Sequence, residues 1–138
     1  MNLEGAPSWA VELVREARVG RLALLDEEDL PRVLPITFAV FEGAVWSAID
    51  QKPKRSSVPA RVRRLRRRPS AALVVDRYSE DWSALAWVEL RGPVSVEPLG
   101  PALEALAAKY PQYEAEPPPG PLLRLAVERV TTWRAADR

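Results

Sequence analysis

The stretch GRLALLDEEDLPRVLPITFAVFEGAVWSAI, residues 20–49, decides the fold class because it holds three apolar runs separated by two turns. Acidic residues end the first run, and the pair Glu42-Gly43, which suits a two-residue hairpin turn, ends the second. Short apolar runs bounded by such turns are typical of β-strands. The stretch therefore predicts a three-stranded antiparallel meander over residues 20–25, 32–41 and 44–49.

Three more strand-like runs follow the meander. AALVVD at 71–76 and ALAWVELRGPVSVEP at 84–98 are predicted strands, and LRLAVERVTTW at 123–133 is predicted to close the chain as an alternating strand. The long strand needs a bend or bulge at Gly92-Pro93, because proline cannot donate a ladder hydrogen bond. Six strands linked mostly as hairpins, with short helices outside, predict a mainly β chain folded as a small closed or nearly closed barrel.

Short helices and one irregular crossing are expected around the strands. Ser8 is predicted to cap a helix over residues 9–18, and another helix is predicted over residues 101–109. The segment 110–121 is rich in proline, which disfavours both regular elements. We therefore expect this segment to cross the surface as ordered but irregular chain.

Composition restricts the chemistry. The chain has 138 residues, which favours a single domain spanning 1–138, and it contains no Cys and no His. Disulfides, thiol nucleophiles and imidazole bases are therefore excluded, and no metal site is expected. The carboxylates interpreted as turn, cap and salt-bridge residues are Asp50, Asp76, Glu80 and Asp81. Because the N-terminal segment lacks an unbroken apolar run, we expect no secretory signal, no membrane span and a cytoplasmic location.

The run KPKRSSVPARVRRLRRR, residues 52–68, concentrates the positive charge. It carries nine of the 20 Lys and Arg residues and no acid, whereas the net charge of the whole chain is only +1. Its place between two predicted strands indicates a local anion site at the edge of the sheet. The low net charge argues against a general nucleic-acid-binding surface.

A short helix is predicted inside this run, opened by Ser57-Val58-Pro59 and ended by Pro69. The residues expected to form its narrow buried stripe are Val58, Val62 and Leu65. The arginines interpreted as its solvated face are Arg63, Arg66 and Arg67.

Five sequence blocks in this order carry a family resemblance: AIDQKPK at 48–54, RRP at 67–69, ALVVDRYSEDW at 72–82, LAWVELRG at 85–92 and KYPQY at 109–113. The chain resembles the split-barrel flavin-binding proteins related to pyridoxamine 5′-phosphate oxidase, above all the branch thought to use the deazaflavin coenzyme F-420. The resemblance covers residues 19–133 and implies a six-stranded antiparallel split β-barrel of the FMN-binding type. It also implies a homodimer with two sites for FMN or coenzyme F-420 at its interface.

The resemblance implies which residues bind this cofactor. Those implied at the phosphate are Lys52, Lys54, Arg55 and Arg61. Those implied beside the ring, the ribityl chain and the phosphate are Pro35, Ile36, Thr37, Ser47, Ala48 and Ile49. Trp87 is implied to approach the cofactor from the partner subunit, and Trp133 is implied to line the substrate side of the site. Both tryptophans also fit core or dimer-interface positions.

The activity implied is hydride transfer between FMN or coenzyme F-420 and a small organic substrate. Oxidation of pyridoxamine phosphate itself is not expected. That enzyme uses a His and C-terminal Arg and Trp motifs, whereas this chain lacks His and has only residues 134–138 after Trp133. Two alternatives remain, namely a non-catalytic flavin or deazaflavin carrier and a nucleic-acid-binding barrel whose arginines contact phosphates.

Overall fold

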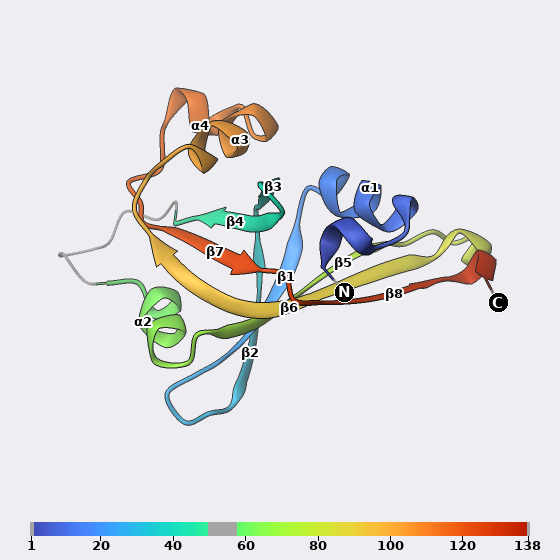
Figure 1. The fold of residues 1–138 in the computed structure, drawn as a ribbon, viewed down its shortest axis with the longest axis horizontal. Helices are drawn as coiled ribbons and strands as arrows, with labels where there is room; N and C mark the ends of the chain where they lie inside the picture. The colour runs from blue at the N-terminus through green and yellow to red at the C-terminus, as the bar shows by residue number, and fades with distance from the viewer. Residues whose placement is uncertain (1, 50–57, 138) are drawn as a thin grey trace.

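The computed structural model describes residues 2–49 and 58–137, which form a curled antiparallel sheet with short helices around it (Figure 1). The strands are β1 Gly20–Leu25, β2 Pro31–Ile36, β3 Ala39–Phe41, β4 Ala44–Ala48, β5 Ser70–Arg77, β6 Ala86–Glu97, β7 Leu122–Ala126 and β8 Arg129–Arg134. The helices are α1 Ser8–Glu16, α2 Ala60–Arg67, α3 Ala102–Lys109 and α4 Gln112–Ala115, with 3-10 turns at Leu3–Gly5, Trp82–Ala84 and Ala135–Asp137.

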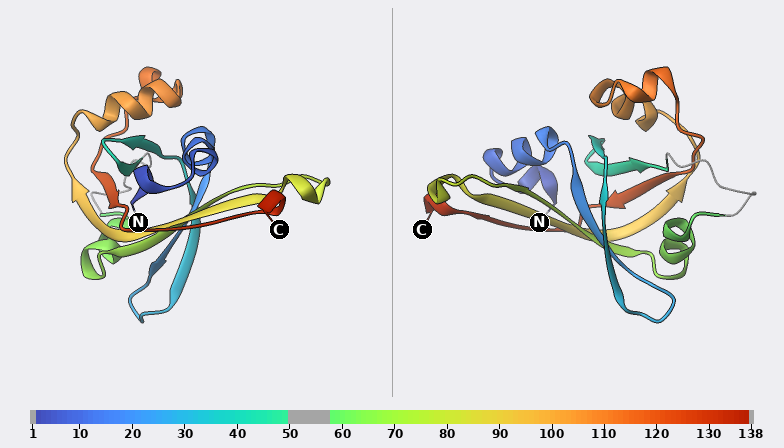
Figure 2. Two further views of the ribbon diagram at one scale, coloured as in Figure 1. Left: turned by 45° about the vertical axis from the view of Figure 1, so that its right-hand side comes forward. Right: turned by 180° about the vertical axis from the view of Figure 1, so that it is seen from behind.

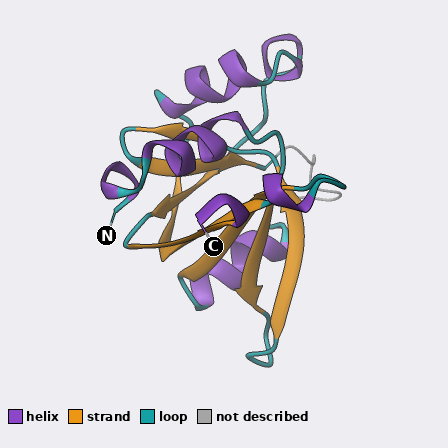
Figure 3. Ribbon diagram, turned by 90° about the vertical axis from the view of Figure 1, so that its right-hand side faces the viewer, coloured by secondary structure: helices purple, strands orange, loops and turns teal. Residues whose placement is uncertain are grey.

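The strand order is β2-β1-β5-β6-β7-β4-β3, with β8 paired to β6, and the sheet curls into a half-barrel (Figure 2). The predicted mainly β, antiparallel split barrel is therefore confirmed. Helices lie outside the strands and cover parts of their faces (Figure 3). The described residues form eight strands rather than six, because two of the predicted strands are each divided.

The predicted strand at 32–41 is divided at Thr37-Phe38. Before this point β2 pairs with β1, and after it β3 pairs with β4. Because β2 and β3 are the two ends of the strand order, this two-residue link joins the two edges of the curled sheet. The apolar pattern continues across the change of partner, so the sequence pattern indicated one strand where the structure has two.

Side-chain hydroxyls bind the backbone of this link, which belongs to neither strand ladder. The Phe38 N–H donates to Tyr110 Oη at 3.1 Å, and that oxygen lies 3.0 Å from Phe38 O and 2.9 Å from Arg18 O. Ser47 Oγ donates to Thr37 O at 2.7 Å. Buried backbone polar groups need such partners, so these hydroxyls replace the missing ladder bonds.

The predicted strand at 123–133 is divided at Val127-Glu128 by a bulge that lies opposite Gly92-Pro93 of β6. Residue pairing runs from Arg91–Arg129 to Val94–Leu125, so that β6 advances by three residues while its partner advances by four. The irregularity predicted at Gly92-Pro93 falls in this interval, but the extra residue lies between Leu125 and Arg129, and β6 itself continues unbroken from Ala86 to Glu97. β7 pairs with the second half of β6 and with β4, whereas β8 pairs only with the first half of β6.

The helix boundaries correct three sequence predictions. Pro7 occupies the N-cap of α1, so Ser8 begins the helix instead of capping it. Pro111 occupies the N-cap of α4, where the missing N–H costs nothing, so proline starts a helix in a segment expected to be irregular. Val58 precedes α2 and is 41% exposed, whereas Val62 and Leu65 are buried as predicted. Ser57 lies outside the described residues.

Ion pairs fix α2 to the turn between β1 and β2. Arg64 Nε donates to Glu27 Oε1 at 3.0 Å, and the Asp29 carboxylate accepts from Arg67 Nη1 at 2.9 Å and from Arg68 Nε at 3.0 Å. Arg67 is therefore a contact residue and not only part of a solvated face. Its acidic partner lies 38 residues earlier in the chain, beyond the reach of helix-periodicity arguments. Within the described ranges, no helix is long and apolar enough to cross a membrane.

We predict that Gly92→Ala strongly destabilises the fold. A Cβ at this position would lie 1.8 Å from the backbone oxygen of Ala126, so β6 and β7 would have to separate at the bulge. Overpacking against backbone costs about 3 kcal/mol or more here. Gly100→Ala is the matched control, because its Cβ would meet nothing closer than 3.9 Å. Urea unfolding of both variants measures the difference, and equal midpoints would contradict the prediction.

We predict that the contact between α2 and the β1–β2 turn weakens in acid. Hydrogen bonds from Arg68 and Arg67 lower the pKa of Asp29 from 3.8 to about 2. Because folding favours the ionised carboxylate, its contribution to stability is present above about pH 4 and is lost as the pH falls towards about 2. Asp29→Asn should therefore be less stable than the native chain at pH 6, with a difference that shrinks towards pH 2.

Asn suits this substitution because it tolerates the φ of 59° at position 29. Glu28→Gln, in the same turn, serves as the control for a lost surface charge. Urea titrations at several pH values provide the measurement. A stability difference between Asp29→Asn and the native chain that does not vary with pH would refute the role of the ionised carboxylate.

Candidate functional site

Two cavities share the side chain of Arg61 in their walls. The first, of about 180 Å³, is lined by Val19, Pro35, Ile36, Thr37, Ala48 and Arg61. The second, of about 230 Å³, is lined by Leu24, Leu34, Ile49, Pro59, Ala60, Arg61 and Arg64. The structure therefore places six of the predicted site residues at these cavities. They come from β2, from the two-residue link Thr37-Phe38 (the closing link), from the end of β4 with the residue after it, and from α2.

Arg61 reaches the cavities because of the way α2 is anchored. Val62 and Leu65 are fully buried in the core, at 0% and 1% exposure, and rotation of the helix about its axis would expose them to solvent. Arg61, next to Val62, is held half-buried on the flank of the helix that borders both cavities. The first turn of α2 also lines the second cavity, and a helix N-terminus and a guanidinium both favour an anion.

The walls facing Arg61 are largely apolar. Pro35, Ile36 and Ala48 line the first cavity, and Ile49 lines the second. Ser47 is 3% exposed, and its hydroxyl donates to the carbonyl of Thr37. Ser47 therefore supports the closing link from behind rather than lining either cavity.

Sequence reasoning assigned no role to two tyrosines that hold the same link. Tyr113 Oη lies 2.8 Å from Thr37 Oγ1, and Tyr110 Oη binds the backbone of Phe38. Both tyrosines are buried and pack edge to face, with ring centroids 5.9 Å apart. They come from the KYPQY block, so a signal was present in the sequence, but nothing in it indicated a contact with residues 37–38, more than 70 positions away.

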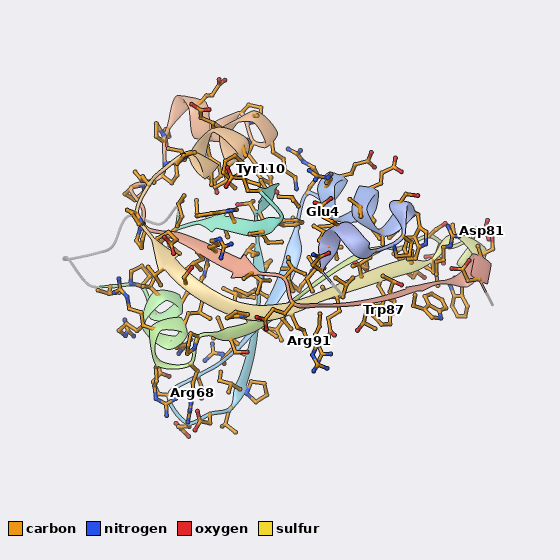
Figure 4. The ribbon with its side chains drawn as sticks, viewed as in Figure 1. Glu4, Arg68, Asp81, Trp87, Arg91 and Tyr110 are labelled. Carbon is orange, nitrogen blue, oxygen red and sulfur yellow. The ribbon has the colours of Figure 1, made fainter. Side chains whose placement is uncertain are left out.

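A cationic cluster surrounds Tyr110. The Arg18 guanidinium lies 4.7 Å from its ring centroid, and Lys109 Nζ lies 4.0 Å from the ring centroid of Phe38. Burial, together with the nearby Arg18, lowers the pKa of Lys109 from 10.5 to about 8. Figure 4 places Tyr110 between α3 and β3, so this cluster packs α3 onto the closed edge of the sheet.

The two predicted tryptophans lie apart from the cavities. Trp87 on β6 pairs directly with Trp133 on β8, and both are partly buried. Figure 4 shows Trp87 on the projecting half of β6, far from α2. Neither residue lines the cavities around Arg61 in this chain. Lys52, Lys54 and Arg55 lie outside the described residues.

The described part of the site fits the phosphate end of a flavin-type cofactor. It offers a half-buried guanidinium, a helix N-terminus and apolar walls. Each cavity alone is smaller than the range for small-molecule sites, about 300–1,000 Å³, so either one suits a part of a ligand such as a phosphate group. A larger and more open depression of about 700 Å³ lies where β1, β5 and the bend of β6 meet, but none of the predicted site residues line it. Among residues 2–49 and 58–137, no group of His, Cys, Asp and Glu could hold a metal ion.

Three solved structures resemble this fold. A heme binding protein from Mycobacterium smegmatis is 23% identical with a TM-score of 0.75, and the match covers 96% of this chain and 57% of that chain. A protein described as an F420 reductase is 19% identical with a TM-score of 0.71, covering 91% and 98%. A FAD-binding protein from Mesorhizobium loti is 17% identical with a TM-score of 0.67, covering 92% and 93%.

At these identities the solved structures show a common fold and nothing more. A search of curated proteins found no match. The family model described as pyridoxamine 5′-phosphate oxidase, however, matches residues 8–134, nearly the whole length of the chain. With the split barrel and the cavities at its closed edge, this match shows that the chain belongs to the pyridoxamine 5′-phosphate oxidase family.

Proposed function

We propose that this protein is an oxidoreductase that binds FMN or the deazaflavin coenzyme F-420 and transfers hydride between that cofactor and a small organic substrate. One observation carries the proposal: Arg61 lines two cavities, one bordered by Thr37 of the link between β2 and β3 and the other by the first turn of α2. Membership of the family and the fold shared with an F420 reductase and a FAD-binding protein support it.

In this proposal Arg61 binds the cofactor phosphate. A charge-assisted hydrogen bond from a half-buried guanidinium is stronger than a neutral one, and the fork geometry of Arg matches a phosphate. Lys52, Lys54 and Arg55 remain the predicted neighbours of Arg61 at the phosphate. Ile36, Ala48 and Ile49 give the apolar wall that excludes water from the cofactor.

The chain positions the reaction and does not supply its reactive group. It contains no His and no Cys, so no imidazole or thiol is present to act as base, nucleophile or soft ligand. When bound, the cofactor supplies the hydride chemistry, and the protein supplies orientation and exclusion of water. The same composition disfavours a heme function, because His and Cys are the most frequent axial ligands of heme iron.

The carrier alternative would use the same site without turnover, so cofactor binding alone does not separate the two functions. Stopped-flow mixing of the reduced cofactor, the protein and a panel of quinones, enones and flavins separates them. Tight binding without faster reoxidation by any acceptor would favour the carrier. The nucleic-acid alternative is weakened by the structure, because Arg64, Arg67 and Arg68 are already paired with acids of this chain.

We predict that Arg61→Ala and Lys54→Ala each weaken cofactor binding by about 1.5–3 kcal/mol, the range for a hydrogen bond to a charged group. The cofactor affinity of Arg61→Lys should lie between those of Arg61→Ala and the native chain, because lysine keeps the charge but loses the two-pronged guanidinium geometry. Arg66→Ala is the control, since Arg66 is exposed on the same helix. Fluorescence titration with FMN and with coenzyme F-420 measures all four. Unchanged affinity of Arg61→Ala for both ligands would remove the phosphate assignment.

We also propose that the protein is a homodimer in which Trp87 reaches the cofactor of the partner subunit. Large apolar side chains left exposed in this chain support a protein interface, among them Val33, Tyr78 and Trp82 at 67%, 63% and 67% exposure. We expect light scattering at micromolar concentration to give about twice the 15.4 kDa monomer mass. A mass near 15.4 kDa would contradict the dimer.

A further inference from the structure

We propose that Tyr113 is a positioning residue of the cofactor site. Its phenol holds the hydroxyl of Thr37 and leaves Thr37 as a hydrogen-bond donor to an acceptor atom on the ring edge of the bound flavin or deazaflavin. This inference rests on the proposed function and adds a residue that lies outside both cavities.

The contact that carries the inference joins distant parts of the chain. Thr37 Oγ1 and Tyr113 Oη are 2.8 Å apart, although the residues are 76 positions apart in sequence. Tyr113 lies on α4 and is 8% exposed. Its ring packs edge to face against Tyr110, whose hydroxyl is hydrogen-bonded to the backbone of Phe38 and of Arg18. The phenol of Tyr113 is thus held by a neighbour that is fixed on the same link.

Thr37 is the neutral polar residue among those that line the first cavity. The other residues that line this cavity carry aliphatic side chains, apart from Arg61. Pro35 brings no N–H, and the Thr37 carbonyl already accepts a hydrogen bond from Ser47. Among the described lining residues, a ligand atom that needs a neutral side-chain donor therefore finds it at the hydroxyl of Thr37.

The direction of the shared hydrogen bond decides what Thr37 can offer. Each hydroxyl has one hydrogen, and either oxygen could donate in the contact between Thr37 and Tyr113. A phenol is a stronger hydrogen-bond donor than an aliphatic alcohol, so the favoured direction is from Tyr113 to Thr37. Thr37 then keeps its own hydrogen for the cavity. Ring carbonyls and ring nitrogens accept such a bond, and Tyr113 thereby favours a ligand that presents an acceptor edge.

A double-mutant cycle with the full chain tests this role. FMN and coenzyme F-420 are titrated by fluorescence into the native protein, Tyr113→Phe, Thr37→Val and the double variant. We expect each single change to weaken binding by about threefold to tenfold, the effect of one neutral hydrogen bond. The double variant should bind no more weakly than Thr37→Val alone, because Tyr113 acts through Thr37. The visible absorption band of bound FMN should shift alike in both single variants.

Two controls separate positioning from general damage to the fold. Ser8→Ala also removes one hydroxyl, from an exposed residue at the start of α1, and should leave affinity and spectrum unchanged. Thr37→Ser keeps the hydroxyl, and should bind within about twofold of the native protein, since the hydrogen bond is retained. If Tyr113→Phe does not fold, the comparison of Thr37→Ser with Thr37→Val decides, and equal affinities of these two would overturn the role of the Thr37 hydroxyl.

The remaining outcomes are distinguishable. A native protein that binds neither ligand would remove the proposed function and this inference with it. If the native protein binds either ligand and Tyr113→Phe binds it with unchanged affinity, only the positioning role is overturned. Equal weakening by Tyr113→Phe in the native and Thr37→Val backgrounds would mean that Tyr113 acts through the fold and not through Thr37.

Discussion

The structure depends on the closure of its sheet through two residues that belong to no strand ladder. Thr37 and Phe38 connect the two edge strands β2 and β3, and their backbone groups would be unsatisfied without help from side chains. Hydroxyls of Ser47 and Tyr110 provide that help. The Phe38 side chain is fully buried at the same point, which fixes the link from the inside. The first cavity lies beside this link, where side-chain hydroxyls replace the interrupted ladder.

The basic helix illustrates how one run of like charges divides into two roles. Arg64, Arg67 and Arg68 pair with Glu27 and Asp29 of the β1–β2 turn. These exposed pairs connect α2 to the turn, whereas the buried Val62 and Leu65 anchor the helix and so place Arg61 at the cavities. The acids thus neutralise a part of the run that would otherwise attract a polyanion, which is consistent with the local anion site that the sequence predicts.

The sequence was informative wherever a local pattern determines structure. Hairpin turns, the place of the irregularity at Gly92-Pro93 and the buried positions 62 and 65 all follow from spacing or from the chemistry of single residues. Prediction failed where a distant partner decides. The division at Thr37 depends on strands that meet only in the barrel, and the pairing of Arg67 depends on an acid 38 residues away. The roles of the two tyrosines were missed for the same reason. A hydroxyl that hydrogen-bonds to residues more than 70 positions away produces no periodic pattern in the sequence.

The prolines of β2 have a consequence for solubility. Among the described residues β2 pairs only with β1, which leaves its other edge without a strand partner there, and its Val33 side chain is 67% exposed. An open, apolar edge strand invites pairing with a foreign strand and aggregation. Pro31 and Pro35 are four residues apart, so the N–H groups that they lack would have pointed to the same edge. Pro35, which also lines the first cavity, therefore removes a donor that a foreign strand could pair with.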